Sequence, residues 1–167
     1  MISPDYVREL AAHNTWQNMS FLTAADALTD AHRKADRGAF FGSIHATLNH
    51  LLWGDQVWLN RFGADMNKPP GTIMESVDLH KSWDAYCSDR RQTDRAIGNW
   101  ADSLTASDLT GDVRWTSGAS GREVTRPKWL LVTHMFNHQT HHRGQVHAML
   151  TAEGVRTDAT DIPFRPE

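Results

Sequence analysis

The sequence predicts an all-α fold, a four-helix bundle formed by a single domain that spans residues 1–167. Three observations carry this prediction. Apolar residues recur at helical spacing in four long segments, near residues 3–28, 43–62, 76–100 and 127–154. The segments between them are charged or contain proline and glycine, which is typical of connections. A chain of this length can bury one hydrophobic core, and four amphipathic helices do so by packing as a bundle.

The first helix is expected to begin at Ser3-Pro4-Asp5. A serine hydroxyl can cap the helix, proline is tolerated in the first turn, and an acid suits the positive end of the helix dipole. The apolar stripe that follows consists of Val7, Leu10, Ala11, Phe21, Leu22, Ala25 and Leu28. Asn14 and Asn18 lie on the same stripe. They are either amides near the margin of the helix or polar groups that line a pocket and bind a substrate. Residues 30–38 are rich in charge and are expected to form a connection.

The second helix is expected over residues 43–62, with Gly63 ending it. Its apolar stripe consists of Ile44, Leu48, Leu51, Leu52, Leu59 and Phe62. Asp55 falls within this stripe, and His50 lies on an adjoining strip that faces at least half inward. His50 could therefore meet histidines of another helix across the bundle, although a lone histidine in this place is more often a satisfied core residue.

The third helix follows a loop, which contains the sequence Pro69-Pro70-Gly71. Ser76 or Asp78 can cap this helix, and its apolar spacing continues to about Trp100.

The helical pattern fades between residues 101 and 126. Residues 112–116 and 122–125 flank the sequence SGASG, which predicts a small hairpin or an ordered loop before the last helix. A connection of this length is a candidate lid or rim for a functional site.

The last helix, expected between Pro127 and Gly154, carries the strongest functional signal. His134, His138, His142 and Gln145 fall on one narrow strip of it, because residues four apart lie on the same helix face. His141 lies beside this strip. Crowded imidazoles without partners would be costly to bury, so the pattern favours a metal site over unrelated polar side chains.

Two histidines at positions i and i+4 can bring ring nitrogens within about 2.0–2.1 Å of one divalent ion. His138 with His142 is the favoured pair, and His134 with His138 competes at the same spacing. The sequence has no HExxH motif, no Glu-x-x-His pair and only one cysteine, Cys87. These absences disfavour a zincin, a di-iron carboxylate centre and a cysteine-rich zinc site. A mononuclear centre with imidazole ligands remains, for which zinc or nickel is expected and iron, copper or manganese are alternatives.

Charge and hydropathy exclude several classes of partner. The formal net charge of −3 provides no general attraction for nucleic acid or anionic lipid. No apolar run approaches the roughly 20 residues that cross a bilayer, and the first residues lack the layout of a secretion signal. With a single cysteine the chain has no internal disulfide, which agrees with a cytoplasmic location. The expected partner is a small-molecule substrate.

Three segments resemble the DinB/YfiT superfamily of metal-dependent enzymes: HNTWQN, HLLWGDQVWLNRF and HMFNHQTHHRGQVHAMLTAEG. The resemblance covers nearly the whole chain, and HQTHHRGQ is its most specific part. It implies an up-down-down-up bundle and a divalent-metal site formed by His50, His138 and His142, which decides against His134 as a ligand. It also makes a homodimer plausible.

The resemblance implies two activity classes: S-transfer or isomerisation assisted by a low-molecular-weight thiol, and hydrolysis of small amide-like or ester-like substrates. The expected chemistry is activation of a thiol or a water by the ion for attack on a small electrophile. Gln145, Asn14 and Asn18 are candidates to orient substrate or water. His134, His141 and Asp55 are candidates for a hydrogen-bond partner of a metal ligand or for a proton carrier.

The alternative class is a non-enzymatic metal-binding protein of the stress response, in which the ion stabilises the bundle. A haem-binding bundle is a further alternative for a chain with ten histidines.

Overall fold

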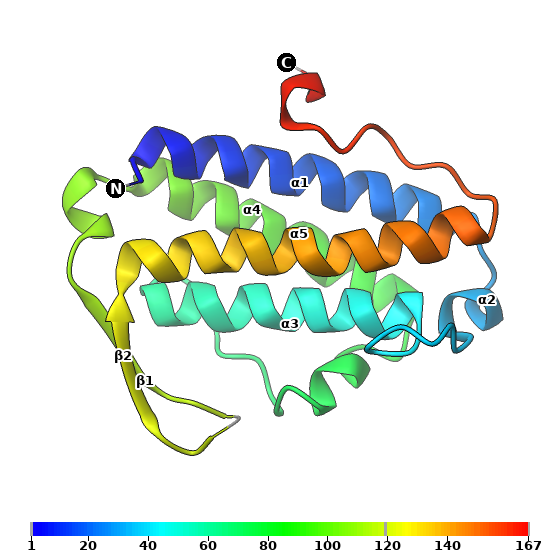
Figure 1. Cartoon of the computed structure of the whole chain (residues 1–167), viewed down its shortest axis with the longest axis horizontal. Helices are drawn as coiled ribbons and strands as arrows, with labels where there is room; N and C mark the ends of the chain where they lie inside the picture. Colours follow the sequence, from blue (N-terminus) through cyan, green and yellow to red (C-terminus); the bar gives the residue numbers. More distant parts are fainter. Residues whose placement is uncertain (1, 119, 167) are drawn as a thin grey trace.

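Four long helices run side by side along the long axis of the molecule (Figure 1). They are α1 (Pro4–Asp26), α3 (Ile44–Phe62), α4 (Trp83–Ser103) and α5 (Lys128–Ala152). This computed structural model describes residues 2–118 and 120–166. Helix α1 packs against α4 and α5, and α3 packs against α5 and α4. Among the helices in these ranges, none is long and apolar enough to cross a membrane.

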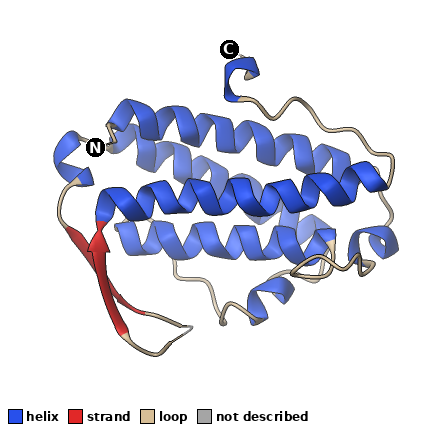
Figure 2. Cartoon of the chain, in the orientation of Figure 1, coloured by secondary structure: helices blue, strands red, loops and turns tan. Residues whose placement is uncertain are grey.

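The remaining elements are short. They comprise α2 (Asp30–Lys34), the strands β1 (Asp112–Thr116) and β2 (Glu123–Pro127), and three turns of 3₁₀ helix at Glu75–Asp78, Ala106–Leu109 and Ile162–Phe164 (Figure 2). The strands pair in antiparallel register with Arg114 opposite Thr125, so of the two expected alternatives the hairpin is confirmed and not the ordered loop. Ala119, in the expected turn, lies outside the described residues. The fold is therefore mainly helical with a small sheet, and the all-α prediction needs that correction.

The helix ends follow the local signals of the sequence. The Ser3 hydroxyl accepts a hydrogen bond from the backbone N–H of Tyr6 at 3.2 Å, and the Ser43 hydroxyl accepts one from Ala46 at 3.1 Å. Gly63 ends α3 with φ = 81°, a left-handed conformation that glycine adopts without a steric penalty. The predicted starts of the first and second helices are confirmed.

The predicted start of the third helix is wrong. Helix α4 begins at Trp83, and its N-cap is Ser82 rather than Ser76 or Asp78. Ser76 lies in a 3₁₀ turn, and the backbone N–H of His80 donates to Asn49 Oδ1 at 2.9 Å. The segment before α4 thus docks on α3 instead of continuing the helix.

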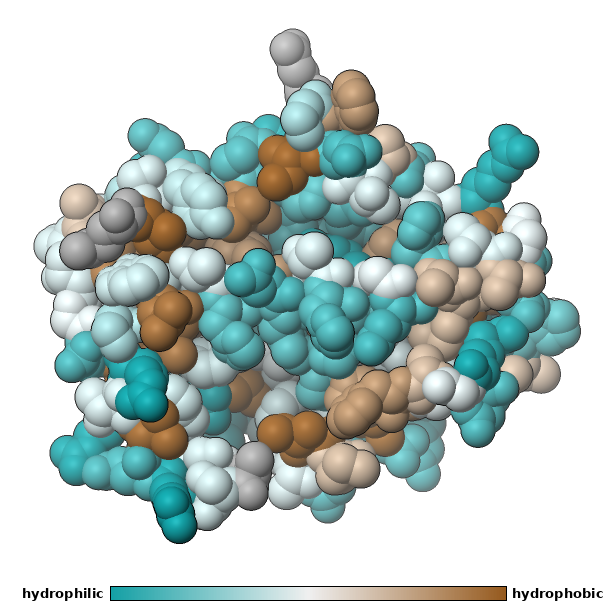
Figure 3. Space-filling view, in the orientation of Figure 1, coloured by the Kyte–Doolittle hydropathy of each residue, from teal (hydrophilic) through white to brown (hydrophobic). Residues whose placement is uncertain are grey.

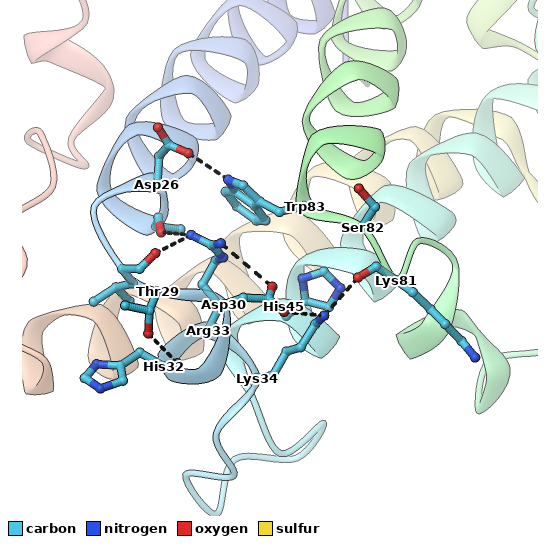
Figure 4. A network of polar contacts seen from close by, with 12 residues as sticks. Asp26, Thr29, Asp30, His32, Arg33, Lys34, His45, Lys81, Ser82 and Trp83 are labelled. Atoms are coloured by element: carbon cyan, nitrogen blue, oxygen red, sulfur yellow. Dashed lines mark hydrogen bonds and ion pairs between the residues drawn. The ribbon is translucent and has the colours of Figure 1, made fainter.

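The connection after α1 contains a helix that the charge pattern did not predict. The Arg33 guanidinium lies 4.6 Å from the centre of the Trp83 ring and donates to the carbonyl of Ala25 at 3.1 Å (Figure 4). Lys34 bonds Asp30 at 2.7 Å and the carbonyl of Lys81 at 2.9 Å. These contacts bind α2 to the start of α4. The loop that follows α2 therefore lies close to the bundle.

The core consists of two apolar clusters separated by a polar layer. One cluster includes Val7, Leu59, Ile97 and Met135, and the other includes Phe21, Leu51, Tyr86 and Leu150. Each long helix contributes to both clusters and carries buried polar residues between them. We call these residues the polar layer: Asn14, Asn18, Asp55, Arg90, Asp94, Gln139 and Arg143.

Candidate metal centre

Three histidines from two helices converge on one point. His50 comes from α3, and His138 and His142 come from α5. The Nε2 atoms of His50 and His138 are 3.0 Å apart. One ring nitrogen from each of the three lies within 4.8 Å of the others, an arrangement that can hold a metal ion. We call this group the histidine triad.

Helix geometry and one glycine bring the triad together. His138 and His142 are one turn apart on α5, which packs directly against α3. Gly54 on α3 faces the His138 ring so closely that a Cβ there would lie 3.0 Å from Cε1 and 3.4 Å from Nδ1. A side chain at position 54 would therefore require the His138 ring to shift by a few tenths of an ångström.

Ser76 determines the tautomer of His50. Its hydroxyl donates its single proton to the carbonyl of Ile73 at 2.5 Å, so it accepts a hydrogen bond from His50 Nδ1 at 2.9 Å. With the proton on Nδ1, the lone pair of His50 Nε2 points toward the other two histidines. This is the usual way in which an outer partner orients a metal-binding histidine.

Gln145 has the same effect on His142. Its Oε1 atom, which can only accept, lies 2.8 Å from His142 Nδ1. The His142 proton is thereby held on Nδ1, and Nε2 is left with its lone pair. The sequence suggested Gln145 as a group that orients substrate or water, whereas the structure places it against a triad histidine.

The triad is electrically neutral near pH 7. Burial lowers the pKa of His50 to about 4, and the nearby His142 adds to the effect. Burial also lowers the pKa of His138 to about 3, with further contributions from the surrounding histidines. The pKa of His142 is lowered by burial, although its bond to Gln145 opposes the change. Neutral imidazoles are the form that binds metal ions.

We expect metal affinity to depend only weakly on pH between 7.5 and 5.5. A lowered pKa keeps the imidazole neutral, so protons compete with the ion only as the pH approaches the lowered values. Three histidines with the ordinary pKa of about 6.5 would lose roughly 10³-fold in affinity over this range, whereas this site should lose less than about tenfold. Competition with a chelator of known pH dependence measures the difference, and a thousandfold loss would contradict the neutral-triad description.

The triad opens onto a cavity of about 560 Å³ between α3, α5, the hairpin and two loops. The ring of Phe41 covers the triad, with its centre 4.0 Å from that of His50. The cavity is lined by Phe40, Phe41, Trp53, Gly54, Val57, Trp58, Arg61, Lys68, Gly71, Thr72, Ile73, Trp115, Thr116, Ser117, Gly118, His134 and the triad. Figure 3 shows brown and tan surface on the lower part of this face, among teal surface. Phe40 and Ile73, two of the lining residues, are exposed hydrophobic side chains.

Two other histidines flank the triad without joining it. The His134 ring lines the cavity, 5.9 Å from the His138 ring and 5.3 Å from Trp58. The His141 ring is exposed, 4.8 Å from that of His142. The two competing pairs of the sequence are thus separated by position, because His142, and not His134, is grouped with His50 and His138.

The remaining candidates lie in the polar layer. Asn14 accepts a hydrogen bond from Arg143, and Asn18 donates to Asp94 Oδ1 at 2.8 Å. Asp55 pairs with Arg90 at 2.8 Å. Among the described residues, those that line the cavity include none of Asn14, Asn18 and Asp55. Their polar atoms face the bundle interior, so these residues are placed to stabilise the fold rather than to contact a ligand in the cavity.

Sequence reasoning missed Gly54, Ser76 and Phe41. The sequence contained a signal for Gly54, which lies one turn from His50 within the helix. Glycine inside a helix costs about 1 kcal/mol relative to alanine, so its presence there needs a reason. Ser76 was interpreted as a helix cap, and no local pattern links Phe41 to a histidine in the next helix. Both contacts depend on how the loops fold back onto α3.

We expect Gly54→Ala to weaken metal binding by about 10- to 100-fold, the range typical of changes just outside the ligand shell. The added methyl group displaces the His138 ring, while the higher helix propensity of alanine preserves or raises the stability of the metal-free protein. Gly98→Ala is the matched control, since a Cβ at that helical glycine meets nothing within 4 Å. Equal metal affinity in both variants, measured by titration, would show that the close approach at Gly54 does not matter.

Comparisons with known proteins bear on the family and on the fold. A family model for the DinB family matches residues 1–167. Among solved structures, a DinB-like protein from Bacillus cereus superimposes with a TM-score of 0.64 at 18% identity, covering 87% of this chain and 91% of that one. At this identity the likeness shows the fold alone. Comparison with curated proteins gives no match.

Proposed function

The chain belongs to the DinB family, and we propose that it is a metal-dependent enzyme that acts on a small molecule. The histidine triad is proposed to hold one divalent ion. One observation carries the proposal: the three converging nitrogens lie in the wall of a cavity of about 560 Å³, not in a sealed core. An ion that only stabilised the bundle would not need such a cavity.

The residues present fit a catalytic ion. Three protein ligands leave coordination positions for a reactant, which is the usual arrangement of catalytic zinc. Neutral imidazoles suit zinc or nickel, and also iron, copper and manganese. The proposed scaffold is the up-down-down-up four-helix bundle of the family, and the order of colours along the four long helices in Figure 1 supports it.

The side chains around the triad have distinct proposed roles. A divalent ion bound there would lower the pKa of a water or a thiol and polarise an electrophile. Phe41 and Trp58 exclude bulk water from the reacting groups. His134 faces the same cavity, and burial lowers its pKa, so its neutral ring can accept a proton. Two reaction types are compatible with this arrangement: hydrolysis of a small ester or amide, and transfer or isomerisation with a low-molecular-weight thiol.

Turnover before and after metal removal tests the proposal. The metal-stripped protein is reconstituted with zinc or nickel, and both forms are assayed with 4-nitrophenyl acetate and with chlorodinitrobenzene plus glutathione, bacillithiol or mycothiol. We expect activity in at least one assay that disappears on stripping and returns on reconstitution. Full metal occupancy without turnover, together with a large drop in melting temperature on stripping, would instead support a structural ion.

The expected homodimer, the cytoplasmic location and the absence of a nucleic-acid partner stay predictions.

A further inference from the structure

Arg61 lies in the cavity wall, at the opposite end of an α3 strip that begins with His50. His50, Gly54, Val57 and Arg61 recur at intervals of three and four residues, and all of them line the cavity. Eleven residues at about 1.5 Å each place the two Cα atoms roughly 16 Å apart along the helix. Helical side chains lean toward the N-terminus, and the Arg61 guanidinium accordingly lies over Trp58, one turn nearer to His50 along α3.

The guanidinium rests against two tryptophans. Its central carbon lies 4.7 Å from the Trp58 ring and 5.3 Å from the Trp115 ring. Trp58 belongs to α3 and Trp115 to β1, so the helix and the hairpin both contact the side chain. The two ring planes meet at 74° with centres 5.7 Å apart, so the guanidinium lies in the corner between them. These cation–π contacts provide none of its five N–H donors with an oxygen acceptor.

Those donors lack an acceptor in the part of the chain that the structure describes. Six other arginines form ion pairs with carboxylates: Arg8, Arg33, Arg37, Arg90, Arg114 and Arg165. Within residues 2–118 and 120–166, Arg61 has no such carboxylate and no hydrogen bond from its guanidinium. Burial alone lowers its pKa, with no opposing contribution from an acid. A half-buried cation without a counter-charge is costly unless something else supplies one.

The described lining of the cavity has no negative charge to supply it. This lining contains two cations, Arg61 and Lys68, and neither aspartate nor glutamate. Along α3 between Arg61 and His50 the cavity is lined by Val57 and Trp58 among others, and the His134 ring lies 5.3 Å from that of Trp58 and 5.9 Å from that of His138. A matching ligand would have an anionic end, an apolar or aromatic middle, and a reactive end at the triad.

We propose that Arg61 determines substrate specificity by binding a carboxylate, and that the substrates are small carboxylic acids with an apolar or aromatic body. The planar fork of a guanidinium binds a carboxylate through two parallel hydrogen bonds, and one such fork matches one monoanion. The assignment of the reactive end rests on the proposed function. The carboxylate site itself depends only on Arg61 and the two tryptophans.

Binding to the full-length, metal-free protein tests the carboxylate site alone. The probes are 3-phenylpropionate and its neutral isostere 3-phenylpropionamide, followed by tryptophan fluorescence because Trp53, Trp58 and Trp115 line the cavity. We expect the carboxylate to bind about tenfold more tightly or better, as for a charged hydrogen-bonded pair. Arg61→Met, which keeps the apolar stem, should reduce this preference to near one, and Arg61→Lys should retain part of it.

Arg95→Met, an equal change of charge at an exposed position of α4, is the matched control and should leave the preference unchanged. Equal binding of the two probes to the wild type, or a preference that survives in Arg61→Met, would overturn the proposal. If Arg61→Met does not fold, an undiminished preference in Arg61→Lys overturns it equally, because a lysine cannot form the two parallel bonds.

A second pair of probes, carrying a hydroxamate at one end and a carboxylate or a carboxamide at the other, is titrated into the zinc-loaded protein. We expect the carboxylate probe to bind more tightly only when Arg61 is present. If zinc adds nothing to hydroxamate binding while phenylpropionate still selects for Arg61, the metal-enzyme proposal fails and the carboxylate site stands. Tight hydroxamate binding without any carboxylate preference would overturn the carboxylate site and leave the metal-enzyme proposal intact.

Discussion

His138→Ala is expected to weaken binding of a divalent ion by at least about 100-fold, because loss of a ligand costs more than the 10- to 100-fold typical of a change just outside the ligand shell. His138 contacts both other members of the triad, with Nε2 3.0 Å from that of His50 and its ring centre 4.7 Å from that of His142. The two imidazoles that remain in the variant are those of His50 and His142, whose ring centres lie 5.0 Å apart. Two ligands hold an ion more weakly than three.

The fold should survive this substitution. The His138 ring lies in a cavity wall rather than in either apolar cluster, so its removal leaves space that solvent can fill. Elemental analysis and titration measure the metal, and circular dichroism with thermal melting of the metal-free forms measures the fold. Any proposed turnover should be lost together with the metal.

His134→Ala is the matched control, since it removes an imidazole from the same helix strip one turn earlier. We expect its metal affinity to change by less than about threefold, because its ring is not one of the three that converge. The opposite ranking, with metal lost in His134→Ala and kept in His142→Ala, would identify the competing pair as the ligands.

Arg90→Met is expected to lower the free energy of unfolding by about 3–5 kcal/mol, the usual cost of removing one partner from a buried ion pair. Arg90 bridges Asp55 at 2.8 Å and Asp94 at 2.7 Å, and none of the three is more than 3% exposed. Without the guanidinium, two carboxylates face each other at the centre of the bundle. Arg91→Met, at the exposed neighbouring position of α4, should change stability by no more than about 0.5 kcal/mol.

The deficit of Arg90→Met should be smaller at pH 5 than at pH 8. Burial already raises the pKa of Asp55 to about 6 and raises that of Asp94, although Arg90 opposes both changes. Removing Arg90 raises these values further, so the folded variant binds more protons than the unfolded chain above the ordinary pKa of about 3.9. Its stability therefore falls as the pH rises through this window. Urea denaturation at both pH values measures these changes. Equal losses of unfolding free energy in Arg90→Met and Arg91→Met would contradict an energetic role for the polar layer.

Local signals were sufficient for most helix boundaries. The hydroxyls of Ser3 and Ser43 accept hydrogen bonds from free N–H groups at helix starts, and Gly63 adopts the left-handed conformation that ends a helix. These interactions are local, so they form wherever the helix lies in the molecule. Ser76 carries the same kind of signal, yet it caps no α-helix, because its hydroxyl bonds Ile73 and His50 instead. A capping residue indicates where a helix can start. Its contacts with residues distant in the sequence determine whether a helix starts there.

Periodicity was less informative about what a buried strip faces. Asn14, Asn18 and Asp55 were correctly expected on inward strips of their helices, but spacing cannot distinguish a cavity wall from a polar layer. That distinction depends on the residues of the other three helices at the same height. Here Arg90, Asp94 and Arg143 lie at that height. They bond Asp55, Asn18 and Asn14, respectively, within the polar layer.

The helical pattern and the strip of histidines could be predicted without any coordinates, because both follow from a repeat of 3.6 residues within one segment. The selection of His142, rather than the equally spaced His134, to accompany His138 beside His50 required the packed molecule. It depends on the offset between α3 and α5 along their axes, which is set by side-chain packing along the whole interface. The same packing places Gly54 against His138, Ser76 against His50, and Arg61 against two tryptophans. It thereby forms the cavity beside the row of imidazoles.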